Sequence, residues 1–362
     1  MKNCLFAGIL SLSMIITLGG CGIDSTATPP PNAFLKYFAY VANRDSSNVS
    51  VYSFDANSGA LTAIGSPVAA GMSPCSITVD PSGKFAYVVN RGSSNISSYS
   101  IDATTGALTA IGSPVATRIS PGAVTVDHTG KFAYLANGLS NNVIAYSINA
   151  VTGELTAIGS PVAAGTLPLS IIVDPTGKFA YATNSNSDNL SAYSINATTG
   201  ELTAIGSPVA AGISPNAVAV DPTGKFVYVA NTNSNNVSAY SINATTGALT
   251  AIGSPAVAGI APSSVTVDPT GKFVYVTNRN DISAYSINAA TGALTVIGNF
   301  VSTGNGPISI TVDPTGKFAY VTNLFSNNVS AFAINAITGA LTAINSPVAA
   351  CSAPISIVTV RR

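Results

Sequence analysis

The stretch NAVAVDPTGKFVYVANTNSNNVSAYSINATTGALTAIGSPAV, residues 216–257, decides the fold. Four short β-type runs lie in it, separated by turn-forming residues: Asn216–Val220, Lys225–Ala230, Val237–Ile242 and Ala248–Val257. In Asp221-Pro222-Thr223-Gly224, Asp, Pro and Gly occupy the positions that a type I turn favours. The second run is apolar at consecutive positions, which is typical of a strand covered on both faces. The stretch predicts one unit of four antiparallel strands.

This unit occurs seven times in one register. The tyrosine of the second run recurs at spacings of 47 residues five times and then 45, at Tyr40, Tyr87, Tyr134, Tyr181, Tyr228, Tyr275 and Tyr320. The missing pair falls between Asn278 and Tyr285, where a loop is shorter. Four strands in each repeat of about 40 to 50 residues indicate a propeller blade. We therefore predict an all-β fold, a seven-bladed β-propeller over residues 34–362.

The two ends of the chain predict how the ring closes. The repeats begin at Lys36 with a second-type run that has no first-type run before it, and they end at Pro354–Val360 with a first-type run alone. These two fragments complete one blade. The C-terminal strand is therefore expected to close blade one and to cover edges that would otherwise aggregate.

The N-terminal residues indicate export. Lys2 precedes an apolar stretch from Leu5 to Leu18 that is too short and too interrupted to span a membrane. Leu18-Gly19-Gly20-Cys21 resembles the bacterial lipobox, which implies a signal peptide over residues 1–20 and lipidation of Cys21. An ordinary secretory signal is the alternative. Residues 21–33 are expected to form a Pro/Ser/Thr-rich tether, and the protein to lie at the bacterial cell envelope, periplasmic or surface-exposed.

Charge is scarce and balanced. Charged residues make up 8% of the chain, and fourteen Lys and Arg match fourteen Asp and Glu, which gives no basic surface for nucleic acid. Contact with a membrane is expected through the lipid alone. Most charges belong to the Asp-x-x-Gly-Lys turns, and we expect these on a solvated face. The single histidine excludes a His-rich metal site, and we predict neither a metal nor a cofactor.

The repeated motifs resemble a known family. Tyr275-Val276-Thr277-Asn278, Tyr320-Val321-Thr322-Asn323 and the VDPTGKF turns are similar to those of YVTN-repeat, seven-bladed propellers, which are grouped with the lactonase-like propellers. That resemblance implies His, Glu and Arg at the channel mouth of an active enzyme. His128, Glu154 and Glu201 lie in turns that we expect away from the mouth, so we assign no catalytic residue.

A few charged and amide side chains are expected at one mouth of the central channel, where propellers bind ligands. The charged candidates are Arg44, Asp45, Arg91, Arg118, Asp188, Arg279 and Asp281. An asparagine ends each second strand, as at Asn43, Asn90 and Asn278. Each asparagine is expected to cap its strand, with a polar collar for a neutral ligand such as a glycan as the alternative. Arg44, Arg91 and Arg279 follow these asparagines, and guanidinium groups suit carboxylate or phosphate.

The cysteines divide into pairs. Cys4 leaves with the signal peptide and Cys21 takes the lipid, while Cys75 and Cys351 remain in a compartment that permits disulfides. Both lie near the predicted ring closure, so a bridge between them is one hypothesis. Separate thiols are the other, because strand-end directions could forbid the bond.

Two functions from different classes are compatible with these residues. The near-identity of the blades favours a non-catalytic, monomeric envelope module with a binding role, toward a protein or a glycan, or a structural role, since an active site demands blade-specific departures. The alternative is a lactonase-like hydrolase that opens a small lactone at the channel mouth.

Overall fold

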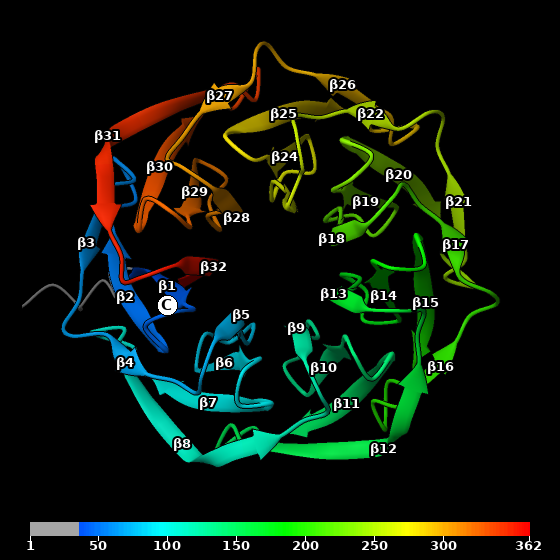
Figure 1. Ribbon diagram of the computed structural model, residues 1–362, viewed down its shortest axis with the longest axis horizontal. Coiled ribbons are helices and arrows are strands. Elements are labelled where there is room, and N and C mark those ends of the chain that lie inside the picture. The colour runs from blue at the N-terminus through cyan, green and yellow to red at the C-terminus, as the bar shows by residue number, and fades with distance from the viewer. Residues whose placement is uncertain (1–35) are drawn as a thin grey trace, which may run out of the picture. The chain divides into compact units, whose positions relative to one another are not determined.

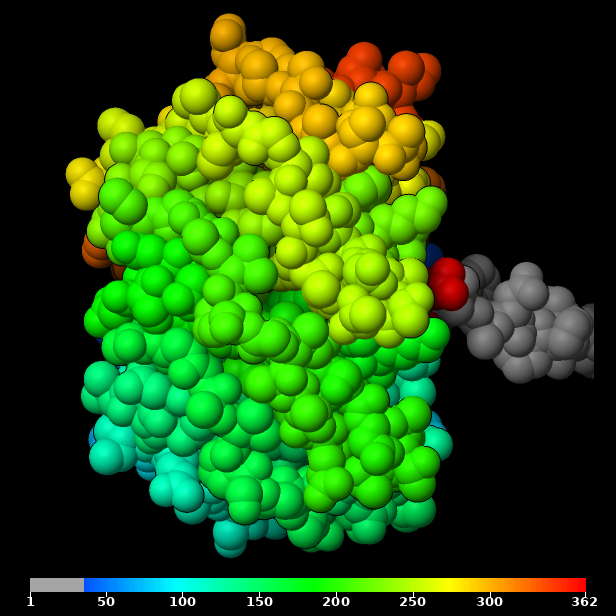
Figure 2. Space-filling view, turned by 90° about the vertical axis from the view of Figure 1, so that its right-hand side faces the viewer, coloured from blue at the N-terminus to red at the C-terminus, as the bar shows by residue number. Residues whose placement is uncertain are grey.

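Seven antiparallel sheets surround a central axis in the computed structural model, which describes residues 36–362 (Figure 1). Each sheet has four strand positions from the axis to the rim, so the predicted seven-bladed β-propeller is confirmed. Along the outer wall, neighbouring blades are in contact (Figure 2). The signal peptide, Cys21 and the tether predicted over residues 1–33 lie outside the described residues. Within residues 36–362, no helix has the length and apolar character needed to cross a membrane.

The strands are short and recur in the same order in each blade. The innermost are β5 (Pro74–Val79), β9 (Pro121–Val126), β13 (Pro168–Val173), β18 (Pro215–Val220), β23 (Ser264–Val267), β28 (Pro307–Val312) and β32 (Pro354–Arg361). The second are β1 (Tyr37–Asn43), β6 (Phe85–Asn90), β10 (Phe132–Asn137), β14 (Phe179–Asn184), β19 (Phe226–Asn231), β24 (Phe273–Thr277) and β29 (Phe318–Asn323). The third are β2 (Asn48–Phe54), β7 (Asn95–Ile101), β11 (Asn142–Ile148), β15 (Asn189–Ile195), β20 (Asn236–Ile242), β25 (Asp281–Ile287) and β30 (Asn328–Ile334).

The outermost strand is continuous in three blades, as β8 (Leu108–Ala116), β12 (Leu155–Ala163) and β31 (Leu341–Ala349). In the other four blades it is split into two segments. These are β3 (Leu61–Ala63) with β4 (Val68–Ala69), β16 (Leu202–Ala204) with β17 (Val209–Ala210), β21 (Leu249–Ala251) with β22 (Ala256–Val257), and β26 (Leu294–Val296) with β27 (Val301–Ser302).

Blade one is closed by the C-terminus, as predicted. Strand β32 pairs with β1 from Tyr37 opposite Arg361 to Ala42 opposite Ser356, and β1 pairs on its other side with β2. The inner edge of β1 is therefore hydrogen-bonded rather than open, which removes a site for aggregation.

The turns between first and second strands hold buried carboxylates. In blade five Asp221 is only 2% exposed, and its carboxylate accepts the N–H groups of Phe226 at 2.7 Å and Thr223 at 3.0 Å. The lysines of these turns are exposed. The turn-forming role predicted for these residues is correct. The expected solvated position is wrong for the aspartates, because each carboxylate closes its own turn through backbone hydrogen bonds that exclude water.

A tyrosine hydroxyl joins each blade to the next. The second-strand tyrosines donate to a glycine carbonyl in the following blade at 2.9 to 3.1 Å, and Tyr320 completes the ring by donating to Gly59 of blade one at 3.0 Å. Phe318, two residues before Tyr320, lies against the same glycine, where a Cβ would approach its ring to 2.4 Å. Gly59 also has a φ of +71°, so the position requires glycine on both grounds.

We predict that Gly59→Ala destabilises the fold more than Gly65→Ala. Both glycines have positive φ, but an added Cβ at Gly65 meets nothing within 4 Å. Gly65→Ala therefore adds backbone strain of about 1 to 2 kcal/mol, whereas Gly59→Ala adds a collision worth about 1 to 3 kcal/mol more. Denaturant unfolding of the two variants measures the difference. Equal destabilisation would contradict the role given to the contact between Gly59 and Phe318.

Candidate channel-mouth site

A cavity of about 300 Å³ lies at one end of the central channel. All seven innermost strands border it with the residues near their start, so it lies where the loops before the first strands and after the second strands meet. Figure 1 shows these strands facing the axis from every blade. This volume is at the lower end of the range typical of small-molecule sites.

One position of the repeat supplies a cavity residue in every blade. It follows the proline that opens the first strand, and its side chain is different in almost every copy: Ile355, Cys75, Gly122, Leu169, Asn216, Ser263 and Ile308 in blades one to seven. The next residue is always Ser or Ala. Gly122 is required by space, because a Cβ there would lie 2.6 Å from the Leu169 carbonyl oxygen. Sequence reasoning missed these residues, although their variation within a nearly uniform repeat is a signal for them.

Arg91 is the single charged residue among those that line the cavity in the described part of the chain. Its Nε donates to the Pro121 carbonyl of the next blade at 3.2 Å, and Thr232 makes the equivalent contact to Pro262 in blade five. Because this bond uses only Nε, the terminal guanidinium nitrogens can donate to a ligand. Arg91 therefore provides a fixed positive charge at the cavity wall.

The Cys75 thiol lies beside Arg91 and donates to the Gly122 carbonyl at 3.0 Å. Burial raises the pKa of Cys75 to about 11, an effect that the nearby Arg91 guanidinium opposes. The thiol is thus protonated at neutral pH and is not a ready nucleophile. Across the cavity, Asn216 Nδ2 donates to the Ser263 carbonyl at 2.7 Å and Ser263 Oγ to the Pro307 carbonyl at 3.2 Å.

The other charged candidates do not line the cavity. Arg44 forms an ion pair with its neighbour Asp45, with Nε 2.7 Å from Oδ1, so the two side chains satisfy each other. Asp188 accepts the backbone N–H of Ser214 at 2.8 Å, and Asp281 accepts the amide of Asn278 at 2.7 Å. Arg118 and Arg279 are exposed on their loops, and the loop after Asn278 is the shortened one. Of the predicted charged set, the structure brings Arg91 alone to the cavity.

The asparagine ring is buried instead of facing a ligand. Asn43, Asn90 and Asn278 are fully buried, and each donates through Nδ2 to the side chains of the first and third residues of its third strand. For Asn90 the acceptors are Asn95 Oδ1 at 2.8 Å and Ser97 Oγ at 2.9 Å. The polar collar offered as an alternative does not form, because the amides point into the blades and tie the second strand to the third.

Cys75 and Cys351 are both free thiols, so of the two hypotheses the structure has the separate thiols and not the bridge. The Cys75 sulfur contacts the next blade at Gly122, whereas the Cys351 sulfur accepts from Asn48 and Ser50 in blade one. Their side chains point toward different partners, so the directions of the two strand ends keep the sulfur atoms from forming a bond.

Histidine, aspartate and glutamate are absent from the cavity wall among residues 36–362. His128 belongs to the turn between β9 and β10, at the other end of the blade, and Glu154 and Glu201 are exposed before the outer strands β12 and β16. In the same range, no group of three or more His, Cys, Asp or Glu side chains is placed to hold a metal ion. The cavity can therefore orient a ligand and stabilise negative charge.

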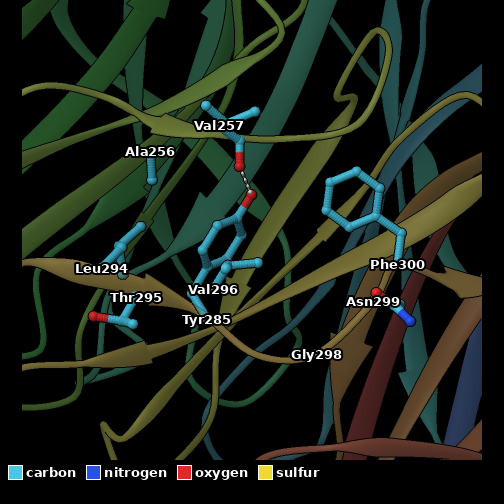
Figure 3. A pocket seen from close by; sticks show the side chains of 9 residues that line it. All are labelled: Ala256, Val257, Tyr285, Leu294, Thr295, Val296, Gly298, Asn299 and Phe300. Atoms are coloured by element: carbon cyan, nitrogen blue, oxygen red, sulfur yellow. Dashed lines mark hydrogen bonds between the residues drawn. The ribbon is translucent and has the colours of Figure 1, made fainter.

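A larger groove of about 620 Å³ lies on the outer wall between blades five and six (Figure 3). Val257, Val296 and Phe300 border it, and Tyr285 donates to the Val257 carbonyl at 2.8 Å across it. Burial raises the pKa of Tyr285 to about 12, so its hydroxyl stays neutral. No charged side chain lines this groove, and we therefore place the candidate site at the channel mouth.

Comparison with known proteins identifies the family. The family model "Lactonase, 7-bladed beta-propeller" matches residues 35–118, 114–213, 171–261 and 254–358, so the chain belongs to this family. No curated protein matches the sequence.

Solved structures share the fold over nearly their whole length. A protein of Bacteroides uniformis proposed to be a 6-phosphogluconolactonase has a TM-score of 0.81 and 21% identity, over 90% of this chain and 99% of that one. A protein of Bacteroides fragilis with the same proposed activity has a TM-score of 0.79 and 22% identity, over 91% and 99%. The periplasmic gluconolactonase of Pseudomonas aeruginosa has a TM-score of 0.77 and 21% identity, over 90% and 99%. At these identities the likeness establishes the fold.

The prediction of a non-catalytic binding module is wrong. It rested on the near-identity of the blades, but the chain is a member of a lactonase family, and the three structural neighbours described above bear lactonase names. These findings favour the alternative of a lactonase-like hydrolase. An active site requires that some residues differ between blades, and the residue after each strand-opening proline does differ.

We predict that alkylation of Cys75 by iodoacetamide accelerates with pH up to about 11. Because the thiolate reacts, the rate should rise about tenfold for each pH unit below that pKa. Mass spectrometry of the peptide that contains Cys75 measures the rate. A plateau near the ordinary thiol pKa would show that Cys75 is not buried in the channel wall.

Proposed function

We propose that this protein hydrolyses a small lactone in the channel-mouth cavity. The observation that supports it most is the position of Arg91, the one charged side chain on the described wall of the cavity, in a chain of the lactonase family. Lactone opening develops negative charge on the carbonyl oxygen, and a guanidinium held at the cavity wall through its Nε is suited to stabilise it. The relatives' names are consistent with this substrate class.

The reaction needs one water molecule. This water loses one proton to the solvent, the resulting hydroxide adds to the lactone carbonyl carbon, and the electron pair of the carbonyl bond moves to the oxygen that faces Arg91. Collapse of this intermediate breaks the ring C–O bond, and the released alkoxide takes a proton from solvent, giving a hydroxy acid. The wall described above contains no carboxylate or imidazole, so hydroxide from solution supplies the nucleophile, and the rate should rise with pH without a bell-shaped optimum.

We predict that Arg91→Ala lowers kcat/KM for lactone hydrolysis about 100-fold, the size of effect expected when one donor to an oxyanion is removed. Arg279→Ala is the matched control, because Arg279 is exposed like Arg91 and holds the same place in its repeat, after the strand-ending asparagine, but lies outside the cavity. Assays of both variants and the unaltered protein on a panel of lactones measure the difference.

Two results would contradict the proposal. If no lactone of the panel is hydrolysed, the proposed lactonase function is wrong. An equal decrease of kcat/KM in the two arginine variants would show that the protein hydrolyses lactones at a site other than this cavity.

A further inference from the structure

Part of the cavity wall consists of aliphatic side chains. Ile308 and Ile355 belong to the adjacent blades seven and one, and Leu169 lies in blade four. At the same repeat position the chain has Ser263, Asn216 and Cys75 in other blades. The fold thus accepts small or polar residues there, so packing of the ring does not require a large apolar side chain at this position, although Ile355 also packs against the core of blades one and two. Their exposure to the cavity suits an apolar part of a ligand.

Apolar side chains continue outward onto the rim of the mouth. Six residues of the surrounding loops are 55% to 68% exposed: Met72, Ile119, Leu139, Ile213, Ile260 and Phe325. Four of them lie two residues before a strand-opening proline, and Leu139 and Phe325 lie two residues after a strand-ending asparagine. Blades with Thr166 or Asn305 at the first of these positions show that a polar residue is accepted. The loops around the mouth thus present apolar side chains beside the cavity in several blades.

The polar groups of the cavity are largely engaged within the protein. The hydroxyls of Ser76, Ser170, Ser264, Ser309 and Ser356 each accept a backbone N–H from a neighbouring inner strand at 3.2 to 3.4 Å. Asn216 and Ser263 donate to backbone carbonyls. The O–H groups of these serines can still donate to a ligand, but the described wall of the cavity has no carboxylate to accept from the hydroxyls of a sugar ring. A phosphate would meet one guanidinium, since Arg44 pairs with Asp45 and the exposed Arg118 and Arg279 lie outside the cavity.

We infer that the substrate is an uncharged lactone with an alkyl substituent, and not a sugar or phosphosugar lactone. This inference rests on the proposed function. The lactone carbonyl faces Arg91, and the alkyl group lies along Ile308 and Ile355 toward the apolar rim. Each methylene that leaves water on binding increases the affinity for the lactone, whereas a hydroxyl placed against an aliphatic wall decreases that affinity.

The test is hydrolysis by the purified protein of δ-lactones that share one ring and differ in the length of an alkyl tail, compared with glucono-δ-lactone and 6-phosphogluconolactone. We expect kcat/KM to increase about threefold to fourfold for each of the first added methylenes. The two sugar lactones should be at least about tenfold poorer than the best alkyl lactone.

Two variants locate the tail. The double substitution Ile308→Ser and Ile355→Ser introduces the residue that blade six has at this position, and it should abolish the increase with tail length. Phe300→Pro, which places in the outer groove the proline that the other six blades have, should leave that increase unchanged. Circular dichroism and thermal melting check that the variants are folded, and the series on the unaltered protein needs no variant.

Each result decides between the two proposals. Hydrolysis of sugar lactones with no gain from the tail would overturn this inference and leave the proposed function standing. Loss of the gain in Phe300→Pro would also overturn it, because the tail would then bind in the outer groove. No hydrolysis of any lactone would overturn the proposed function and this inference with it.

Discussion

The hydrogen bond from each second-strand tyrosine to a glycine carbonyl of the next blade is the contact on which the ring depends. It repeats seven times, and the bond from Tyr320 to Gly59 joins the last blade to the first. The tyrosine hydroxyls are buried, which raises their pKa, so they remain neutral donors. Since the phenylalanine two residues earlier packs on the same glycine, each junction combines a directional bond with a close fit. Fixed junctions hold the inner strands at a constant distance from the axis.

This framework separates the residues that build the ring from those that can serve a ligand. The Phe, Tyr, Asn and Asp of the repeat have the same structural contacts in nearly every blade. The residue after the strand-opening proline faces the channel and has no such shared contact, so it differs from blade to blade. Chemistry can change at that position without loss of the fold, which is a general property of sites built on a rigid scaffold.

Much of the fold could be predicted from the sequence, because its spacing has a direct physical meaning. The tyrosine interval gave the number of blades, and the unmatched runs at Lys36 and Pro354 gave the closure by β32. The site was harder, since charge alone does not fix the direction of a loop side chain. Arg44 turns to its neighbour Asp45, whereas Arg91, at the same place in the next blade, has no such neighbour and reaches the channel. The near-identity of the blades does not argue against catalysis, because the residue after each strand-opening proline varies at the cavity wall.

The most direct measurement is a crystal structure of the protein with a δ-lactam that has an alkyl tail, an analogue whose ring resists hydrolysis. We predict that the lactam carbonyl binds the guanidinium of Arg91 in the channel mouth and that the tail lies along Ile308 and Ile355. Binding of the lactam only in the groove bordered by Val257, Val296 and Phe300, with the channel mouth free of it, would contradict the assignment of the site.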